Sequence, residues 1–191
     1  MPSAIGNFVV GMVGNIVIFI GSIFHSGQHY PQLDLENVIY MDVPAGRVVI
    51  QMLPETAPLH VQRVKQLVRE HYYDGCPWHR VIPYFIAQTG DHTGTGLGGT
   101  GVNIPAEFSN IPFKRGTVAM ARRQWENSAD SQFFIVLKDS EYLNGKFTVW
   151  GKVIDGMAVV DKIKKGDAKE GKVKDPDVII DMRIAADVIA N

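Results

Sequence analysis

The stretch WHRVIPYFIAQTGD, residues 78–91, places a single arginine among aromatic and aliphatic side chains. If the segment is extended, Arg80, Ile82, Tyr84, Ile86 and Gln88 face the same way, because successive side chains of a strand alternate between its two faces. Burying an unpaired guanidinium costs free energy. Arg80 is therefore expected either to form a salt bridge or to serve a functional site, and this stretch alone leaves both possibilities open.

Three further blocks follow in a fixed order: GTVAMAR (residues 116–122), SADSQFFIVL (residues 128–137) and LNGKFTVWGKVIDGM (residues 143–157). Together with residues 78–91 they resemble the cyclophilin-type peptidyl-prolyl cis/trans isomerases. The resemblance covers about residues 37–186, and the short connections are similar to the bacterial branch of the family. It implies rotamase activity in protein folding, and a closed eight-stranded antiparallel β-barrel capped by two α-helices.

Hydrophobic periodicity favours the same mainly β fold. Many short apolar runs are separated by turn residues, which is typical of a closed antiparallel barrel. One helix is expected after Thr56, which can cap it, with valines recurring at helical spacing. The expected strands cover residues 38–43, 47–53, 117–121, 133–137, 147–153 and 178–184, and a second helix is expected over residues 157–165.

Size, charge and cysteine content restrict the possible classes of protein. The 191 residues suffice for one domain with a sizeable core and an appendage. A formal net charge of −1, with no basic run, argues against binding to nucleic acid. Cys76 is the only cysteine, which excludes an internal disulfide.

Residues 4–24 contain no charged side chain. In helical geometry this length spans roughly 30 Å, about the thickness of the hydrocarbon core of a bilayer. A cleaved signal peptide is the alternative, but no Lys or Arg precedes the apolar run and no A-x-A-like site follows it. The sequence therefore predicts an N-terminal transmembrane anchor over residues 1–25, a polar tether over residues 26–36 and an isomerase domain over residues 37–191.

The location of the domain is expected to be extracytoplasmic. Neither flank of the apolar run carries a Lys or Arg that would hold it in the cytoplasm. We expect a single-pass membrane protein whose isomerase domain lies in the periplasm or in an organelle such as the mitochondrion.

Residues 94–101, GTGLGGTG, contain a literal G-x-G-x-x-G. A dinucleotide-binding loop needs a strand before it and a helix after it, and the following Val-Asn-Ile-Pro cannot open that helix. The segment is interpreted as a flexible surface loop bordering the substrate groove.

The chemistry of prolyl isomerisation gives Arg80 a role. An X–Pro bond turns slowly because amide resonance sets a barrier of about 18–20 kcal/mol. In the twisted state the prolyl nitrogen becomes pyramidal and carries a localised lone pair, so a fixed guanidinium donating to it stabilises that state selectively. No covalent bond is made or broken, and no cofactor is expected. The same family resemblance assigns this role to Arg80.

The resemblance also implies the remaining site residues. Gln88 would bind the substrate carbonyl and help to orient Arg80, and Ala121 and Arg122 would offer backbone contacts near Gln132. The apolar pocket for the proline ring is predicted from Phe85, Ile86, Phe134 and Leu143, which suit the usual make-up of ligand sites. Proline-containing peptides or unfolded proteins are the expected partners.

Two rim positions depart from the best-known family members, which carry tryptophan and histidine where this chain has Tyr142 and Phe147. Loss of the indole N–H is expected to weaken binding of cyclosporin-type ligands, since tyrosine presents its donor elsewhere. Arg122 and Arg123 give the groove a positive edge, which either favours acidic peptides or reflects two solvated arginines.

Neither proton transfer nor a metal is expected at this site. Isomerisation needs no proton transfer, so a hydrogen-bonding structural role is expected for His79 rather than general-base catalysis. Cys76, His79, Asp91 and His92 have no recognised metal-ligand spacing.

Two functions remain open from the sequence. The first is a membrane-tethered enzyme that accelerates X–Pro isomerisation during folding, a step that limits many folding reactions. The second is a cyclophilin-like accessory subunit of a larger membrane complex with little or no catalytic role. The Arg80, Phe85, Gln88 and Phe134 set favours the enzyme, whereas glycines within residues 4–24 suit packing against helices of partner subunits.

Overall fold

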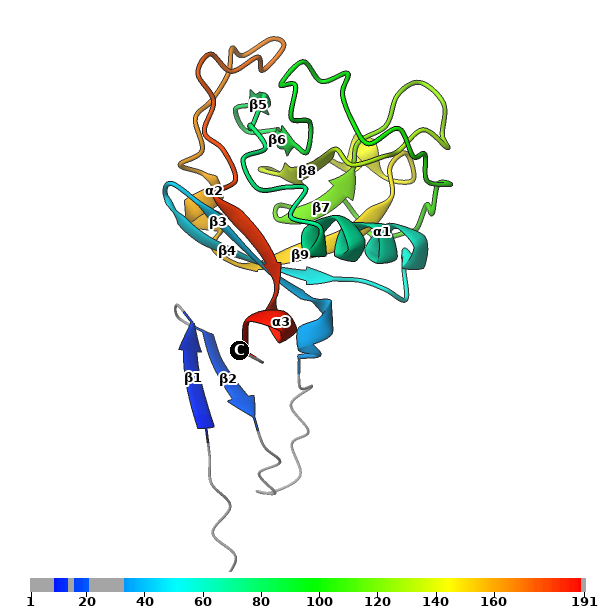
Figure 1. Cartoon of the computed structure of the whole chain (residues 1–191). Helices are drawn as coiled ribbons and strands as arrows, with labels where there is room; N and C mark the ends of the chain where they lie inside the picture. Colours follow the sequence, from blue (N-terminus) through cyan, green and yellow to red (C-terminus); the bar gives the residue numbers. More distant parts are fainter. Residues whose placement is uncertain (1–8, 14–15, 21–32, 190–191) are drawn as a thin grey trace, which may run out of the picture. The chain divides into compact units, whose positions relative to one another are not determined.

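The computed structural model describes residues 9–13, 16–20 and 33–189. The chain divides into two compact units, residues 1–34 and residues 35–191, each described by itself. The described part of the first unit is an antiparallel pair of strands, β1 (Val9–Val13) and β2 (Ile16–Ile20), in which Val9 pairs with Ile20 (Figure 1).

The helix predicted across residues 4–24 is therefore wrong for these two segments. Valine and isoleucine dominate both of them, and β-branched side chains favour strands over helices. Within the described ranges no helix has the length and apolar character needed to cross a membrane. The other residues of the predicted span, and residues 26–32 of the predicted tether, lie outside the described residues.

The second unit is built on one antiparallel sheet of eight strands, which confirms the predicted mainly β class (Figure 1). The sheet order is β10-β3-β4-β9-β7-β8-β6-β5. The strands are β3 (Val38–Val43), β4 (Gly46–Met52), β5 (Arg80–Ile82), β6 (Ile86–Thr89), β7 (Thr117–Met120), β8 (Phe133–Val136), β9 (Val149–Asp155) and β10 (Asp181–Ile184).

The barrel is open rather than closed, which corrects the prediction. The edge strands β5 and β10 do not pair with each other. Isolated bridges, Pro77 with Val178 and Arg80 with Lys172, and single backbone bonds such as Ile179 N to Cys76 O at 2.9 Å connect the β5 side to the segment before β10. Proline has no amide hydrogen to donate, so Pro77 cannot continue a regular ladder.

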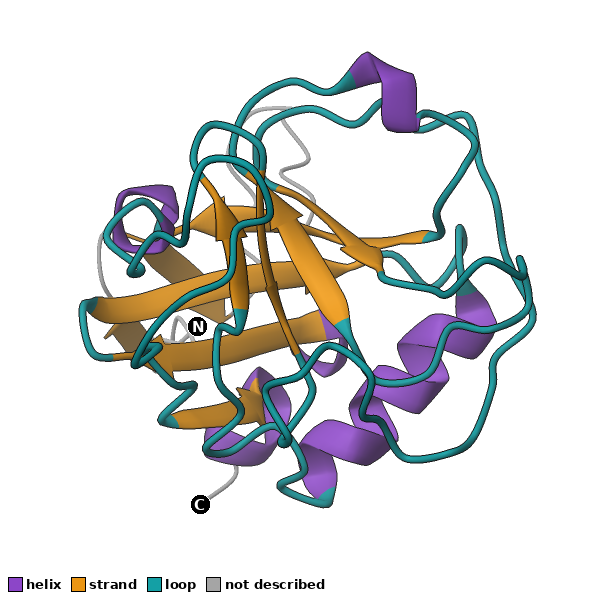
Figure 2. Ribbon diagram, turned by 90° about the horizontal axis from the view of Figure 1, so that it is seen from above, coloured by secondary structure: helices purple, strands orange, loops and turns teal. Residues whose placement is uncertain are grey.

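The helices also differ from expectation in number and length. They are α1 (Pro58–Arg69), α2 (Met157–Val160) and α3 (Ala185–Ile189), with short 3₁₀ turns η1 (Leu35–Asn37) and η2 (Glu141–Leu143). α2 ends five residues before the predicted boundary at residue 165, because Lys162 N and Ile163 N already bond three residues back, as in a 3₁₀ turn. α3 was not predicted. Figure 2 shows α1 running beside the strands.

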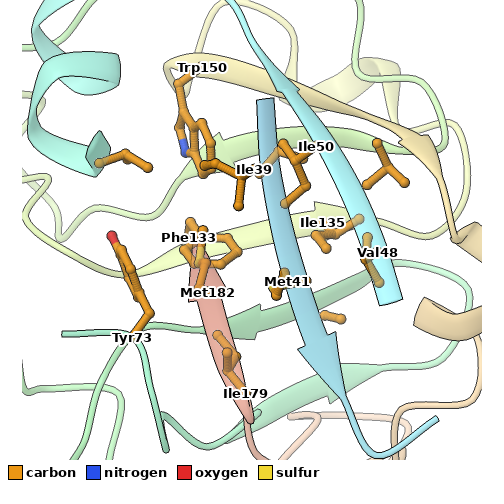
Figure 3. Packing of buried hydrophobic residues seen from close by; sticks show 14 of the residues in the cluster. Ile39, Met41, Val48, Ile50, Tyr73, Phe133, Ile135, Trp150, Ile179 and Met182 are labelled. Atoms are coloured by element: carbon orange, nitrogen blue, oxygen red, sulfur yellow. The ribbon is translucent and has the colours of Figure 1, made fainter. Parts of the chain in front are cut away.

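Alternation along β8 divides the buried side chains between two clusters. Phe133 and Ile135 belong to the main core, where they pack with Met41, Ile50 and Trp150 (Figure 3). Phe134 and Val136 point to the other face of the sheet and belong to a second cluster with Ile86, Phe113, Ala119, Leu143 and Val149. Successive side chains of a strand point to opposite faces, so burying Phe133 and Ile135 in the main core directs Phe134 and Val136 to the opposite face. The cavity described next opens on that face.

Candidate active site

A cavity of about 240 Å³ opens on the second apolar cluster. It contains all the predicted site residues except Gln132 and Tyr142. The lining residues are Arg80, Phe85, Ile86, Gln88, Ala121, Arg122, Phe134, Leu143 and Phe147. They come from β5, β6, β8 and the segments after β7 and around η2, so the fold brings together residues that are up to 67 positions apart (80 to 147).

The β5–β6 hairpin places Arg80 directly opposite Gln88. The Nη1 of Arg80 donates to Gln88 Oε1 at 3.2 Å, and its Nε donates to the backbone oxygen of Glu170 at 3.0 Å. Within the described part of the chain Arg80 makes no ion pair. The guanidinium is thus fixed by neutral acceptors, and no carboxylate among the described residues pairs with it.

The floor of the cavity is apolar and closely packed. Ile86, Phe134 and Leu143 are all buried. The Phe134 ring packs edge-on against Phe147, with 5.5 Å between ring centroids, and stacks on Phe113 at 6.3 Å. Phe113 was missed from the sequence because it contacts Phe134 behind the cavity and does not line it. An apolar recess beside a fixed cation suits a small ring next to a polar backbone.

The turn between β5 and β6 positions Phe85. Tyr84 adopts a positive φ of 59°, and Phe85 N donates to Ile82 O at 3.1 Å, which closes the turn. Phe85 O in turn accepts a bond from Leu137 N at 2.8 Å. These contacts fix the backbone on both sides of the Phe85 ring at the cavity wall.

Arg122 is engaged at the rim and is not a freely solvated arginine. Its guanidinium lies 5.1 Å from the centroid of the Phe147 ring and 5.9 Å from that of Phe108. Its Nε donates to the Lys146 backbone oxygen at 3.0 Å. Arg123 is exposed, and its Nη2 donates to Leu97 O at 3.4 Å.

Gln132 and Tyr142 border the cavity without lining it. Gln132 Oε1 accepts a hydrogen bond from Gln88 Nε2 at 2.9 Å, so it lies behind the site. Tyr142 is 61% exposed, and its ring lies 5.6 Å from the Phe85 ring, centroid to centroid.

The loop over residues 92–101 is bound by two carboxylates. Asp91 accepts bonds from the backbone N–H groups of Gly96 and Gly98, at 2.7 and 3.1 Å, and Asp130 accepts one from Gly101 N at 2.7 Å. A Cβ on Gly98 would clash with the Asp91 carboxylate. The glycines therefore let the loop wrap around the protein's own carboxylates. The G-x-G-x-x-G pattern of residues 94–101 gives little sign of these contacts, because the same pattern is typical of dinucleotide-binding loops.

The groups set aside for proton transfer or metal binding stay outside the cavity. Burial lowers the pKa of His79, although the Asp91 charge partly opposes this, and His79 does not line the cavity. Burial raises the pKa of the Cys76 thiol to about 12, so the thiol stays protonated at neutral pH. Among the described residues no cluster of three or more His, Cys, Asp or Glu is arranged to hold a metal.

Comparison with known proteins gives a consistent result. The family described as "Cyclophilin type peptidyl-prolyl cis-trans isomerase/CLD" matches residues 38–184. A probable peptidyl-prolyl cis-trans isomerase of Brucella suis is 50% identical over 168 residues, which covers 81% of this chain and 85% of that protein. Peptidyl-prolyl cis-trans isomerase B of Bacillus subtilis is 38% identical over 132 residues, covering 68% of this chain and 92% of that protein.

Solved structures show the same fold. A cyclophilin from Hirschia baltica superposes with a TM-score of 0.74 at 24% identity, covering 81% of this chain and 76% of its own. A Cryptosporidium parvum cyclophilin-type isomerase, solved in the presence of the dipeptide Ala-Pro, gives a TM-score of 0.71 at 29% identity, covering 77% and 98%. The chain therefore belongs to the cyclophilin-type peptidyl-prolyl cis/trans isomerases, and it is an enzyme of that class.

Proposed function

We propose that Arg80 is the catalytic hydrogen-bond donor of this isomerase and that the apolar cavity holds the proline ring of the substrate. The observation that carries the proposal is a guanidinium with no ion pair among the described residues, fixed at the mouth of an apolar recess. When the X–Pro bond twists, the prolyl nitrogen gains a localised lone pair, and a guanidinium N–H can donate to it. The planar ground states lack that acceptor, so the interaction lowers the barrier selectively.

The substrate is proposed to be a proline-containing peptide or an unfolded protein segment. Phe85, Ile86, Phe134, Leu143 and Phe147 surround a volume suited to an apolar ring. Gln88 is proposed to bind the backbone carbonyl beside the ring, and its position in the same cavity as Arg80 supports this. The backbone of Ala121 and Arg122 is proposed to contact the peptide along one wall. The Cryptosporidium parvum protein was solved in the presence of the dipeptide Ala-Pro, which supports this substrate class.

Replacement of Arg80 tests the proposal. In a protease-free assay on an Ala-Pro peptide, we expect the full chain with Arg80→Ala to lose roughly a hundredfold or more in kcat/KM, about 3–4 kcal/mol of transition-state stabilisation. Arg80→Lys should recover only part of the loss, because an ammonium lacks the planar fork of donors. Arg47→Ala is the control, since Arg47 pairs with Asp42 and does not line the cavity.

Two outcomes would contradict the assignment. Wild-type activity in a folded Arg80→Ala variant would remove Arg80 from the mechanism. If wild type and variant both matched the uncatalysed rate while folded, the domain would act as a binding subunit of a larger assembly.

We further propose that residues 4–24 attach the enzyme to a membrane, with the isomerase domain on the extracytoplasmic side or within an organelle. The support is compositional, because no charged side chain occurs in these residues and no Lys or Arg flanks them. Attachment would concentrate the enzyme where translocated chains fold and where slow X–Pro isomerisation limits their folding. Membrane fractionation of the full chain tests it.

A further inference from the structure

A continuous series of side-chain hydrogen bonds leads away from Arg80 into the protein. Arg80 Nη1 donates to Gln88 Oε1 at 3.2 Å, and Gln88 Nε2 donates to Gln132 Oε1 at 2.9 Å. Gln132 Nε2 donates to the backbone oxygens of Gly96 at 3.0 Å and Gly98 at 2.8 Å. The series therefore joins the catalytic guanidinium to the loop over residues 92–101.

The direction of every bond in this series follows from its far end. Backbone oxygens can only accept, so the NH₂ group of Gln132 must face Gly96 O and Gly98 O. The Gln132 oxygen then faces Gln88, whose NH₂ group must point toward it. The oxygen of Gln88 is consequently the atom that meets Arg80. If Gln132 were turned over, Gln88 would present an NH₂ group to a guanidinium, and the bond that fixes Arg80 would be lost.

Asp91 sets the position of the two loop oxygens. Its carboxylate is fully buried and accepts bonds from Gly96 N, Gly98 N and both the backbone N and the Oγ1 of Thr93, the last two at 2.8 Å each. Gly96 adopts a positive φ of 79°, which an L side chain rarely does. The same two glycines that donate to Asp91 thus accept from Gln132.

The Asp91 side chain is ionised at neutral pH. Burial raises the pKa of its carboxyl, but the hydrogen bonds from Thr93, Gly98 and Gly96 outweigh burial and bring the pKa below its ordinary value. An ionised carboxylate only accepts, so every N–H around it must point inward. This leaves Gly96 O and Gly98 O available to Gln132.

We propose that Asp91 is a positioning residue for the isomerisation, which acts through loop residues 96–98, Gln132 and Gln88 to aim Arg80 at the prolyl nitrogen. The inference rests on the proposed role of Arg80. It extends the functional site to a buried residue that touches neither the cavity nor the substrate. Asp91 should affect the stability of the twisted transition state and not that of the planar ground states, because only in the twisted state can the prolyl nitrogen accept a hydrogen bond from Arg80.

The isosteric substitution Asp91→Asn tests this proposal. Asparagine keeps the size of the side chain but puts an NH₂ group against donors, whichever way it is turned. In the full chain we expect kcat to fall about tenfold while KM stays within about twofold, the pattern of an interaction made only in the transition state. Resonances of the side-chain NH₂ groups of Gln88 and Gln132 should shift as their bonds change.

Asp130→Asn is the matched control. Asp130 anchors the other end of the same loop through Thr100 Oγ1 and Gly101 N, and it has no bond to either glutamine. We expect its kcat and KM to stay within about twofold of wild type. An equal loss in Asp130→Asn would overturn the proposal, because it would show that any loosening of the loop reduces activity.

A double-mutant cycle with Gln88→Ala separates positioning from general damage. If Asp91 acts through Gln88, adding Asp91→Asn to Gln88→Ala should change kcat by less than about twofold. Losses in kcat that multiply, or an unchanged kcat in folded Asp91→Asn, would overturn the proposal.

If Asp91→Asn does not fold, Gln132→Glu replaces it, since a carboxylate there would repel Gly96 O and Gly98 O. Wild-type activity in Arg80→Ala would instead refute the proposed function itself.

Discussion

Tyr142 borders the apolar cavity, and its ring lies 5.6 Å from the Phe85 ring, centroid to centroid, at a tilt of 33°. Because Tyr142 is largely exposed, a larger aromatic side chain at this position would not disturb the buried floor of the cavity. Cyclosporin-type ligands of this family are expected to use an indole N–H at this position, and tyrosine places its donor differently.

Tyr142→Trp should therefore strengthen cyclosporin binding by about threefold to tenfold, the equivalent of one net hydrogen bond of about 0.5–1.5 kcal/mol. The measurement is inhibition of the isomerase by cyclosporin in wild type and variant. The uninhibited kcat/KM should change by less than about threefold, which verifies an intact cavity. A wild-type enzyme inhibited as strongly as the variant would show that the rim residue does not determine affinity.

At the residue scale, the sequence predicted the identity of the cavity residues better than their local geometry. Arg80, Ile86 and Gln88 were expected on one face of a continuous strand. The strand instead breaks at Tyr84, whose positive φ turns the chain, and Arg80 meets Gln88 across a hairpin. Tyr84 is 82% exposed as a result. Alternation is a local rule, whereas this turn depends on the bonds that Phe85 makes with Ile82 and Leu137.

At the element scale, α1 shows what local signals miss. Thr56 was predicted to cap the helix, but the N-cap is Ala57, which has no side-chain cap bond. The cap comes from Glu107, which accepts from Leu59 N at 3.0 Å and His60 N at 2.9 Å. Glu107 is 47 residues from His60, so no pattern within the helix could reveal it. Pro58 in the first turn and the buried valines were predictable from local rules.

The Glu107 cap links the stability of the fold to pH. Burial lowers the pKa of His60, although Glu107 partly opposes this, so His60 is mainly neutral and donates from Nδ1 to Glu107 at 2.6 Å. Burial raises the pKa of Glu107, but the bonds from Leu59 and His60 outweigh burial and lower it. For both groups the unfolded state binds protons more readily, so both contributions are present above the unfolded pKa and are lost as pH falls.

Glu107→Gln should reduce the free energy of unfolding at pH 7.5 by about 1–2 kcal/mol, because the amide NH₂ cannot accept from the helix N-terminus. Urea unfolding of the full chain at pH 7.5 and 5.5 measures this. The window for His60 starts near its ordinary pKa of 6.5 and extends downward, so wild type should lose stability between these pH values. Glu55→Gln, an exposed carboxyl before the same helix, is the control. Equal effects of the two substitutions would contradict the cap.

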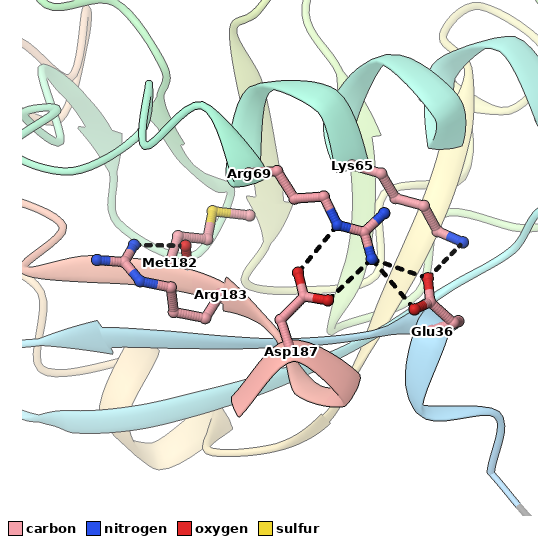
Figure 4. Close-up of polar contacts among 6 residues, drawn as sticks. All are labelled: Glu36, Lys65, Arg69, Met182, Arg183 and Asp187. Carbon is pink, nitrogen blue, oxygen red and sulfur yellow. Dashed lines mark hydrogen bonds and ion pairs between the residues drawn. The ribbon is translucent and has the colours of Figure 1, made fainter. Parts of the chain in front are cut away.

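At the scale of the whole molecule, short apolar runs and turn residues predicted six of the eight strands of the second unit, and the number eight came from the family resemblance. The predicted closed barrel is wrong, because β5 and β10 do not pair. The segments beside these two edge strands meet only through isolated bridges and single backbone bonds, and Pro77 has no amide hydrogen with which to continue a ladder. α3 was equally invisible, because its position depends on distant charges. Arg69 of α1 donates to Asp187 of α3 at 2.9 Å and to Glu36 of η1 at 3.0 Å (Figure 4). These ion pairs tie together the start and the end of the second unit.

The proposed membrane attachment concerns the first unit, because residues 4–24 carry no charged side chain that would favour water. We expect the full chain to sediment with membranes and to resist salt and alkaline washing. A double Val10→Lys, Ile18→Lys variant should be released into the soluble fraction, because burying an unpaired charged side chain among lipid chains costs free energy. Ile180→Lys is the matched control, since Ile180 is an exposed isoleucine of the second unit and its replacement should leave the protein membrane-bound.

Protease added to sealed vesicles then reports on which side of the membrane the isomerase domain lies. Wild type in the soluble fraction would refute membrane attachment, and isomerase activity that is equal in all three proteins would show that catalysis belongs to the second unit alone.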